Sequence, residues 1–174
     1  KVKRFFNKKI PRCKEVKLSW FGGEPLLCKD TMFDILEHVD LLCKKYGVVL
    51  VGTINTNGYL LDVETFKKMV SYRVRTYEIC IDGTEELHNS QRPHCENDDS
   101  YQTIINNLLK IRDEVKTNAF HIALRVNITP KIIQSLEKHV ERMSELFAND
   151  NRFHMLFQGV RDWGGDRIDS QMVL

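Results

Sequence analysis

Short apolar runs alternate with longer amphipathic segments along most of the 174 residues. Closely spaced β-branched and other apolar residues predict strands, whereas apolar residues that recur at three- and four-residue steps predict helices. Strands that alternate with helices favour a mainly parallel sheet with right-handed crossovers. The sequence therefore predicts an α/β fold whose strands cover residues 16–21, 48–54, 76–81, 121–128 and 152–159.

Two helices are expected in the first half of the chain, over residues 30–46 and from about residue 62 to 71. Asp30 is placed as the N-cap of the first of these helices. Its apolar stripe consists of Phe33, Leu36, Val39, Leu42 and Tyr46.

The second half of the chain is expected to begin with a polar loop that extends through Asp99. Ser100 can cap the helix that follows the loop. Thr129 and Pro130 predict another helix start, because proline is favoured at the first helical position after a capping residue. The stripe of this last helix is expected at Ile133, Leu136, Val140, Met143 and Phe147.

Composition narrows the class of protein. A chain of 174 residues that is 42% apolar can bury one real core. Its net charge of +2 is too small to predict a nucleic-acid partner. It has no apolar run long enough for a membrane span and no secretory leader, so we expect a cytoplasmic protein without membrane contact. The start at Lys1 and the end at Leu174 suggest truncation at both ends.

The cysteines lie far apart, and their number is odd. Disulfide frameworks normally use an even number, while zinc and cluster motifs place their ligands in close pairs or triplets. We therefore expect reduced, mostly structural thiols and no metal site at Cys13, Cys28, Cys43, Cys80 and Cys95.

Unusual residues follow the strands, at the edge where parallel α/β proteins place their sites. Gly22 and Gly23 end the first strand and would let a ligand approach the main chain, and Glu24 adds a negative charge. Asn57 and Gly58 follow the second strand. Each pair could also be an ordinary turn.

Polar residues mark the next two strands as well. Cys80 and Asp82 lie at the end of the third strand, and Asp82 could bind hydroxyls or a cation, or simply form a turn. Arg125 and Asn127 share one face of the fourth strand, opposite its apolar residues. They need partners if that face is inside a barrel, whereas on an edge strand both would be solvated. A final group, Arg161, Asp162, Trp163, Gly164 and Gly165, follows the fifth strand.

The pattern alone leaves two architectures open, an open doubly wound sheet and an arc of a barrel. The three spaced glycines of a dinucleotide-binding fold are absent after the first strand, which weakens the first alternative. An unrelated nucleotide-binding domain that uses Gly22 and Gly23 as an anion turn therefore ranks low among the candidate functions.

The order of the motifs carries a resemblance. The motifs follow one another as Gly-Gly-Glu-Pro, Thr-Asn-Gly and Asp-Gly, with His88 and Arg92-Pro93 downstream. This order resembles that of the radical S-adenosylmethionine (SAM) superfamily. More narrowly, the chain is similar to the peptide-modifying branch that includes anaerobic sulfatase-maturating enzymes and members with a C-terminal SPASM cluster domain. The run LSWFGGEPLL at residues 18–27 is the most specific part of the likeness.

The resemblance implies a partial (βα)6 TIM-like barrel in which residues 1–174 are the central part of the domain. It implies SAM and a 4Fe–4S cluster as cofactors, a flavodoxin or ferredoxin as electron donor, and a peptide or protein substrate. The family holds its cluster with CxxxCxxC in a loop after the first strand. This chain lacks that spacing, so we expect the segment alone to be inactive.

By position, the resemblance also implies a set of SAM-binding residues. The glycine loop would contact the SAM amino group, largely through its backbone, and the later strands would face its carboxylate and ribose. These residues are Gly22, Gly23, Glu24, Asn57, Cys80, Asp82, Arg125 and Asn127. No catalytic residue is predicted.

Three positions depart from the common family pattern. Phe21 stands where sulfatase-maturating relatives often have Gln, Cys80 where Ser is usual, and Asn89 where Asp is commoner. The departures at Phe21 and Cys80 favour an alternative, a degenerate barrel that binds or scaffolds without catalysis. We also expect self-association through the open sheet edge at residues 16–21.

Overall fold

The computed structural model describes residues 1–92 and 99–160. In this part of the chain, five parallel strands form one sheet in the order β1-β2-β3-β4-β5, which confirms the predicted α/β class. The strands are β1 (Glu15–Trp20), β2 (Val49–Thr56), β3 (Val74–Cys80), β4 (His121–Ile128) and β5 (Phe153–Gly159).

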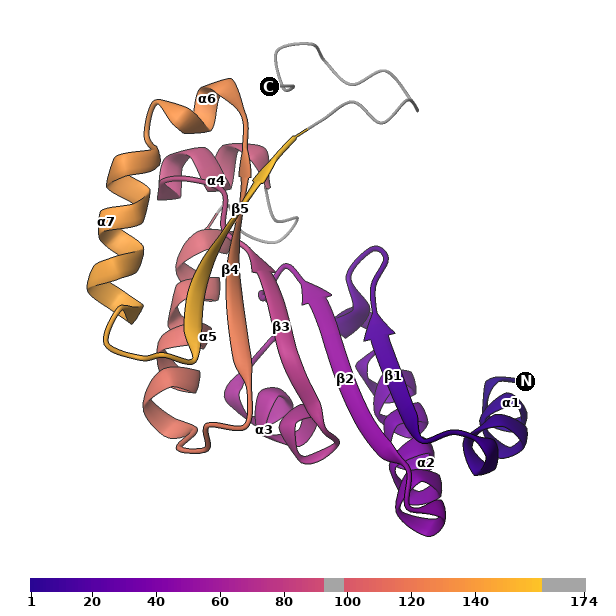
Figure 1. Ribbon diagram of the computed structural model, residues 1–174. Coiled ribbons are helices and arrows are strands. Elements are labelled where there is room, and N and C mark those ends of the chain that lie inside the picture. The colour runs from indigo at the N-terminus through magenta and orange to yellow at the C-terminus, as the bar shows by residue number, and fades with distance from the viewer. Residues whose placement is uncertain (93–98, 161–174) are drawn as a thin grey trace.

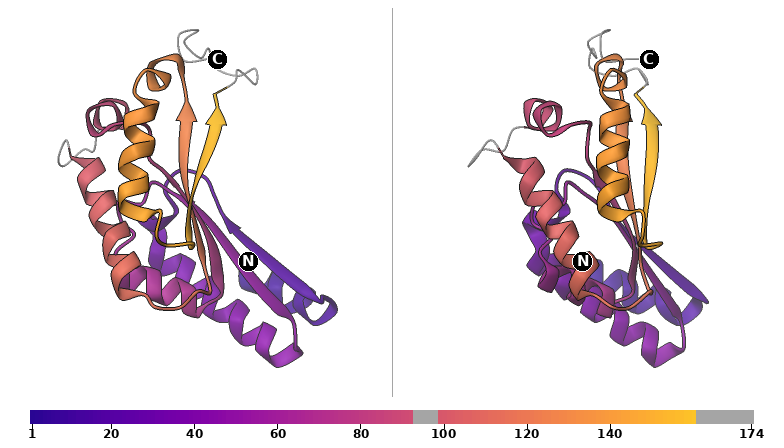
Figure 2. Two further views of the ribbon diagram at one scale, coloured as in Figure 1. Left: turned by 60° about the vertical axis from the view of Figure 1, so that its left-hand side comes forward. Right: turned by 90° about the vertical axis from the view of Figure 1, so that its left-hand side faces the viewer.

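Helices precede and connect these strands. The α-helices are α1 (Val2–Lys9), α2 (Lys29–Tyr46), α3 (Val63–Ser71), α4 (Glu85–Gln91), α5 (Ser100–Glu114), α6 (Pro130–Ile133) and α7 (Leu136–Phe147). Two 3-10 turns, η1 (Ile10–Arg12) and η2 (Pro25–Cys28), precede β1 and α2. Helices α2, α3, α5 and α7 lie against one face of the sheet and leave the other face open (Figures 1 and 2).

Strand order and helix placement together settle the architecture. A doubly wound sheet reverses its strand order at a switch point and carries helices on both faces. Here the strands follow one another in chain order and the connecting helices stay on one face, as in a (βα) barrel. The sheet is therefore an arc of a TIM-like barrel.

The core lies between the sheet and its helices. Alternate residues of the central strands point into it, among them Ile54, Tyr77 and Leu124, each with at most 1% of its surface exposed. Phe66 of α3 packs on Tyr77 with ring centroids 4.4 Å apart and on Phe120 at 4.7 Å. Burial of one such side chain contributes about 1.5–3 kcal/mol, so this cluster fixes β3 and the start of β4 against α3.

The residues between these core positions face the open side of the sheet, and many are polar. Thr53 of β2 donates a hydrogen bond to the Ser19 hydroxyl of β1 over 3.1 Å. Glu78 and Arg125 lie on neighbouring strands and form an ion pair over 2.7 Å. A barrel interior with polar side chains is suited to hold a polar ligand rather than a packed apolar core.

Two predicted helix starts are wrong. Asp30 is not the N-cap of α2, because η2 leads directly into this helix; Cys28 is the N-cap and Asp30 lies in the first turn. Ser100 does not cap α5 either. Asp99 does so, accepting a hydrogen bond from the Gln102 amide. The N-cap at Thr129 is confirmed, since its hydroxyl accepts a hydrogen bond from the Ile132 amide.

Two further expectations are corrected. The expected loop before residue 99 contains α4, whose His88 is completely buried. The last helix is interrupted after Ile133 and restarts at Leu136 as α7. The interruption shifts the buried stripe, so that Ile132 is buried and Ile133 is 51% exposed.

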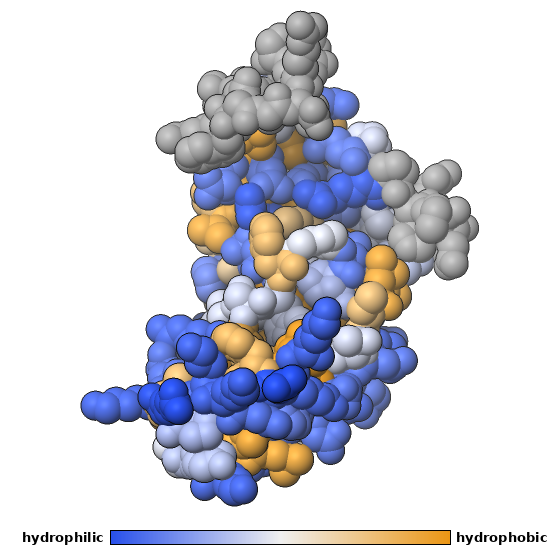
Figure 3. All heavy atoms as spheres, turned by 90° about the vertical axis from the view of Figure 1, so that its right-hand side faces the viewer, coloured by the Kyte–Doolittle hydropathy of each residue, from blue (hydrophilic) through white to orange (hydrophobic). Residues whose placement is uncertain are grey.

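Within the described part of the chain, β1 and β5 are the edge strands of the sheet, since β1 pairs only with β2 and β5 only with β4. The face that includes α1 and the β1 side of the molecule is largely hydrophilic, with apolar side chains scattered over it (Figure 3). Self-association through β1 stays a prediction. Within residues 1–92 and 99–160, no helix is both long and apolar enough to cross a membrane.

Candidate functional site

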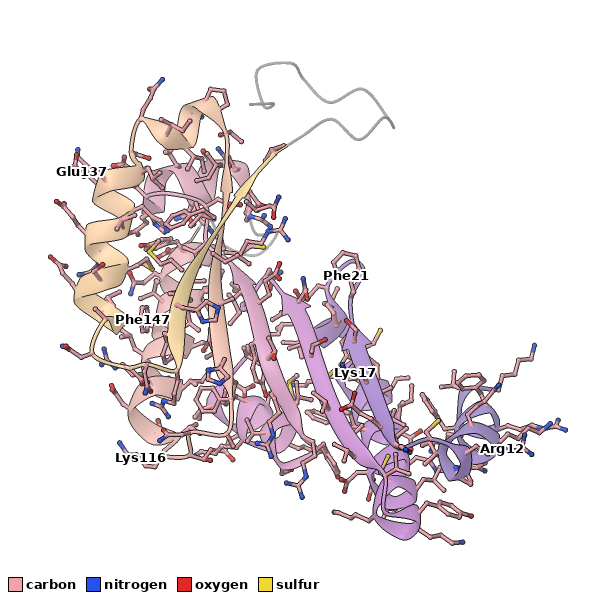
Figure 4. The ribbon with its side chains drawn as sticks, in the orientation of Figure 1. Arg12, Lys17, Phe21, Lys116, Glu137 and Phe147 are labelled. Atoms are coloured by element: carbon pink, nitrogen blue, oxygen red, sulfur yellow. The ribbon has the colours of Figure 1, made fainter. Side chains whose placement is uncertain are left out.

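A depression of about 380 Å³ lies at the carboxyl ends of the strands, on the open side of the sheet. It is bordered by the loop after β1, where Phe21 is 78% exposed (Figure 4). The residues that line it come from four strands and their loops: Phe21, Gly22, Gly23, Glu24, Asn55, Thr56, Asn57, Glu78, Cys80, Arg92 and Arg125. The structure thus brings together six of the eight predicted site residues in one wall, and Asp82 and Asn127 lie directly behind it.

Gly22 and Gly23 form the exposed lip of this depression. Gly22 has a φ of +122°, a conformation open to glycine and rarely to other residues. A Cβ atom built on either glycine would meet nothing within 4 Å, so the main chain here faces open space. A ligand can therefore reach the backbone of this loop.

The Glu24 carboxylate is bonded to the protein itself. It accepts hydrogen bonds from the Thr56 hydroxyl at 2.7 Å, the Asn57 amide at 2.7 Å and the Leu26 amide at 3.0 Å. These bonds tie the loop after β1 to the loop after β2. Glu24 therefore holds the shape of the lip.

Asn57 forms a turn that leads out of β2. Its side-chain oxygen accepts a hydrogen bond from the Tyr59 amide at 2.9 Å, and the Thr56 hydroxyl accepts one from the Gly58 amide at 3.1 Å. Gly58 has a φ of +80° at the sharp point of the turn. The turn interpretation is therefore confirmed, and it coexists with a place on the wall of the depression.

The Asp82 carboxylate lies behind the depression, and 3% of the residue's surface is exposed. It accepts hydrogen bonds from the Asn127 amide at 2.7 Å, from the Asn127 side chain at 3.1 Å and from Arg92 Nε at 2.7 Å. The Asp82 amide donates to His88 Nδ1 over 3.2 Å. With its oxygens bonded in this way, Asp82 acts on the site by positioning Arg92 and Asn127.

Arg125 and Asn127 share one face of β4, as predicted, and bond to each other over 2.9 Å. The alternative of a solvated edge strand is wrong, because β4 pairs with both β3 and β5. Arg125 Nη1 donates to Glu78 Oε1 on β3. About 30% of its side chain remains exposed, so the guanidinium can also meet a ligand in the depression.

Cys80 is half-buried on the same wall, in register with Arg125. Burial raises the pKa of its thiol, with Arg92 and Arg125 acting against the shift and Asp82 and Glu78 adding to it. The thiol is therefore protonated at neutral pH and contributes shape and a weak hydrogen-bonding group rather than a thiolate.

Five lining residues were not among those predicted from sequence: Phe21, Asn55, Thr56, Glu78 and Arg92. Thr56 and Glu78 lie two residues before Gly58 and Cys80, and the strand alternation that put Arg125 with Asn127 also puts Glu78 on the same face as Cys80. Arg92 was noted as part of a motif but not assigned to the site. Pro93, Cys95 and the group at residues 161–165 lie outside the described residues.

The described cysteines do not assemble a metal centre. Within residues 1–92 and 99–160, no three His, Cys, Asp or Glu side chains come close enough to hold a metal ion. Cys13 and Cys28 are exposed, Cys43 is buried in a small apolar cluster with Ile10, Val39, Val48 and Leu50, and Cys80 lines the depression. This part of the chain therefore does not fit an iron–sulfur cluster.

The fold and the site define a class: a parallel barrel arc with a polar ligand depression at the carboxyl ends of its strands. Residues 6–141 match the radical SAM superfamily model, and the chain belongs to that superfamily. Cysteine-type anaerobic sulfatase-maturating enzymes of two Clostridium perfringens strains are 29% identical over 94 residues, 54% of this chain and 24% of each relative. The chain thus spans about a quarter of those curated relatives.

Solved structures support the fold. The chain superposes on native anSMEcpe with bound AdoMet with a TM-score of 0.73 at 16% identity, covering 99% of this chain and 45% of that one. Against native anSMEcpe with bound AdoMet and the Kp18Cys peptide, the TM-score is 0.72 at 16% identity, with coverage of 99% and 46%. The likeness confirms the partial radical SAM barrel.

Proposed function

We propose that the chain is the central part of a radical SAM barrel domain and forms the SAM-binding wall of an enzyme that modifies a peptide or protein. The observation that carries the proposal is the charge pattern of the depression. An exposed glycine backbone lies on one side of it, and the Arg125–Glu78 pair lies on the other. Its volume of about 380 Å³ lies in the range of small-molecule sites.

SAM carries an ammonium, a carboxylate, a sulfonium and a ribose, and the wall offers a group for each charge. The backbone of Gly22 and Gly23 would receive the ammonium, as exposed carbonyls can. Arg125 would bind the carboxylate, and Glu78 would lie near the sulfonium. Glu24, Asp82 and Asn127 would hold these groups in place, because their side chains already bond to the protein.

When bound and reduced through a 4Fe–4S cluster, SAM supplies a 5′-deoxyadenosyl radical that abstracts hydrogen from a substrate. The CxxxCxxC motif that would hold the cluster does not occur in the 174 residues. The electron step therefore belongs to the longer protein that we infer, with flavodoxin or ferredoxin as donor in the cytoplasm. We expect the segment alone to bind without reacting.

The proposed peptide or protein substrate rests on the relatives. The Clostridium perfringens proteins are named for sulfatase maturation, and a similar solved structure contains a peptide beside AdoMet. A peptide could approach the open face of the sheet, which the helices leave uncovered (Figure 2). A sulfatase-maturase-like reaction is the proposal that these similarities support.

Isothermal titration with SAM tests the binding role directly. We expect Arg125→Gln to weaken SAM binding at least tenfold. The double variant Arg125→Gln with Glu78→Gln removes both charges and leaves neither one unpaired, so it separates lost binding from lost folding. Lys110→Gln, on the exposed side of α5, is the matched control. Unchanged affinity in the double variant, with an intact circular dichroism spectrum, would contradict the assignment of Arg125.

A degenerate, non-catalytic barrel remains the second candidate, favoured by Phe21 and Cys80 at positions where relatives carry polar groups. Anaerobic reconstitution of the longer protein with iron and sulfide distinguishes the two. Formation of 5′-deoxyadenosine from SAM would support the enzyme. Loading of a cluster without that product would support the binding module.

A further inference from the structure

The first 14 residues, which form α1, η1 and the link to β1, are strongly basic. They carry seven of the 26 lysines and arginines and none of the 24 acidic residues. The other 160 residues carry 19 cations and all 24 acidic residues, a net charge of −5. The small net charge of the chain therefore arises from a basic first part and an acidic remainder.

This basic part has a fixed place in the fold. Helix α1 and η1 pack on α2, and Ile10 is completely buried there. Lys3 forms an ion pair with Asp34 of α2 over 2.6 Å, and Asn7 Oδ1 is hydrogen-bonded to His38 Nε2 over 2.8 Å. The cations are therefore presented by a docked helix, on a face that is largely hydrophilic (Figure 3).

Most of these cations have no carboxylate beside them. Lys3 is the one member of the group with an ion pair among residues 1–92 and 99–160. The other six are exposed and unpaired there: Lys1, Arg4, Lys8, Lys9, Arg12 and Lys14. Lys8 and Lys9 suit the carboxyl end of α1, where the helix dipole favours cations, but the other four have no such role. Like charges gathered on one surface repel one another, and an anionic partner relieves that repulsion.

Two exposed apolar side chains lie among the cations. Phe5 is 56% exposed and Val2 is 50% exposed, and their spacing of three residues puts them on one side of α1. Next to them is a hollow of about 840 Å³, bordered among others by Lys8, Lys9 and Arg12. A surface that combines unpaired cations with apolar side chains matches a partner that carries both negative charges and an apolar side chain.

We propose that this α1–η1 surface, formed by the exposed side chains of residues 1–14, binds an acidic segment of a separate partner protein, in which Asp or Glu residues flank an apolar side chain. Helix α1 is eight residues long, which corresponds to about 12 Å. A nucleic-acid backbone or an anionic bilayer extends well beyond that length and would meet the acidic remainder of the chain. A short acidic segment can contact the basic surface alone.

The surface is separate from the SAM depression. Arg12 and Phe21 lie beyond opposite ends of β1 (Figure 4). The inference therefore goes beyond the proposed function and does not require it.

Fluorescence anisotropy with a labelled synthetic peptide tests the proposal. The probe is a short peptide in which glutamates flank a Leu-Phe pair, and its control has glutamine in place of every glutamate. We expect saturable binding of the glutamate peptide alone. Its affinity should fall at least about tenfold between about 50 mM and about 300 mM salt, because exposed charges are screened at high ionic strength.

Matched variants locate the binding surface. The test variant removes three exposed cations that border the hollow: Lys8→Gln, Lys9→Gln and Arg12→Gln. It should weaken peptide binding at least about tenfold and is expected to fold, because these side chains are exposed. The control variant removes the same charge from exposed positions on other parts of the fold: Lys110→Gln, Lys116→Gln and Lys138→Gln. It should change the affinity less than about twofold, because its charges lie away from the surface.

Phe5→Ala tests the apolar contribution. It should weaken binding of the Leu-Phe peptide about threefold, as expected for partial burial of one ring, and leave binding of an all-glutamate peptide unchanged. Equal losses in the test and control variants would overturn the proposal. Tighter binding of single-stranded RNA or of phosphatidylserine vesicles than of the peptide would also overturn it, as would failure of the longer protein that we infer to bind the peptide.

Discussion

The Glu24 carboxylate accepts a hydrogen bond of 2.7 Å from the Thr56 hydroxyl, which joins the loops that follow β1 and β2. The same carboxylate also accepts hydrogen bonds from the Asn57 and Leu26 amides. One side chain therefore holds the glycine lip of the depression against the neighbouring strand.

Replacement of Glu24 by Ala should therefore lower both stability and SAM affinity. Two backbone amides and a hydroxyl lose their acceptor, and a loss of about 1–3 kcal/mol in the free energy of unfolding is expected. Urea denaturation measures this loss, and titration with SAM measures the affinity. Glu37→Ala, at an exposed position of α2, is the control and should change stability by less than about 0.5 kcal/mol. Equal stability of the two variants would contradict the role of Glu24.

The Asp82–Arg92 pair predicts a coupled effect. Asp82→Asn removes the charge that Arg92 Nε meets at 2.7 Å, while the new amide keeps part of the bonding to Asn127. We expect a loss of about 1.5–3 kcal/mol, the range for hydrogen bonds to charged groups, because the Asp82 side chain is only 4% exposed. Chemical denaturation of both single variants and of the double variant with Arg92→Gln measures the coupling. Additive losses would mean that the pair does not interact.

The strands and the barrel class could be predicted from sequence because they rest on local patterns. A nearly continuous apolar run marks β2, and apolar residues that alternate with polar ones mark β4. Parallel strands bring their carboxyl ends to the same end of the sheet wherever they lie in the chain. For that reason Gly22, Cys80 and Arg125 could be placed together before any contact was known. Their placement required only the alternation of side chains and the direction of the strands.

The contacts between loops could not be predicted in this way. Helix α4 has little apolar periodicity and is anchored by the buried His88, which contacts Tyr101 of α5 and accepts a hydrogen bond from the Asp82 amide. The partners of Glu24 and Asp82 are likewise set by how loops meet across strands. The sequence pattern also did not predict that the helix is interrupted after Ile133. Because of this interruption, Ile132 is buried in place of Ile133.

His88 predicts a pH dependence of stability. Burial, followed by the nearby Arg92, lowers its pKa from the ordinary 6.5 to about 4, with His139 acting in the same direction and Asp82 against it. Between pH 6.5 and 4 the His88 ring is protonated in the unfolded chain but neutral in the folded chain. The free energy of unfolding is therefore not reduced by His88 above pH 6.5, and it falls as the pH drops towards 4. The slope should be about 1.4 kcal/mol per pH unit for one histidine.

Denaturation at several pH values between 4.5 and 7 measures this slope, and NMR titration of the His88 ring gives its pKa directly. Burial lowers the pKa of His139 as well, so the observed slope is expected to exceed that of His88 alone. A His88 ring that titrates at its ordinary value in the folded protein would show that the imidazole is accessible to solvent.

The last prediction separates backbone strain from side-chain contact at two glycines. Gly47 and Gly58 both have positive φ, +66° and +80°. A Cβ atom on Gly47 would meet nothing within 4 Å, whereas one on Gly58 would approach Ile79 Cγ2 to 2.8 Å and Ile104 Cγ2 to 3.2 Å. Gly47→Ala should therefore lose about 1–2 kcal/mol, the cost of the left-handed conformation. Gly58→Ala adds the displacement of core side chains and should lose about 2–4 kcal/mol.

Urea denaturation of the two variants measures the difference, and SAM titration adds a second readout. Gly58 shapes the turn in which Asn57 bonds to Glu24, so Gly58→Ala should also weaken SAM binding. Gly47 ends α2 just before β2 begins, at the amino ends of the strands and away from the depression. Gly47→Ala should therefore leave SAM affinity unchanged. Equal losses of stability would mean that the loop after β2 can move away from Ile79 without disturbing the core. This wall of the depression would then be held less rigidly than its hydrogen bonds indicate.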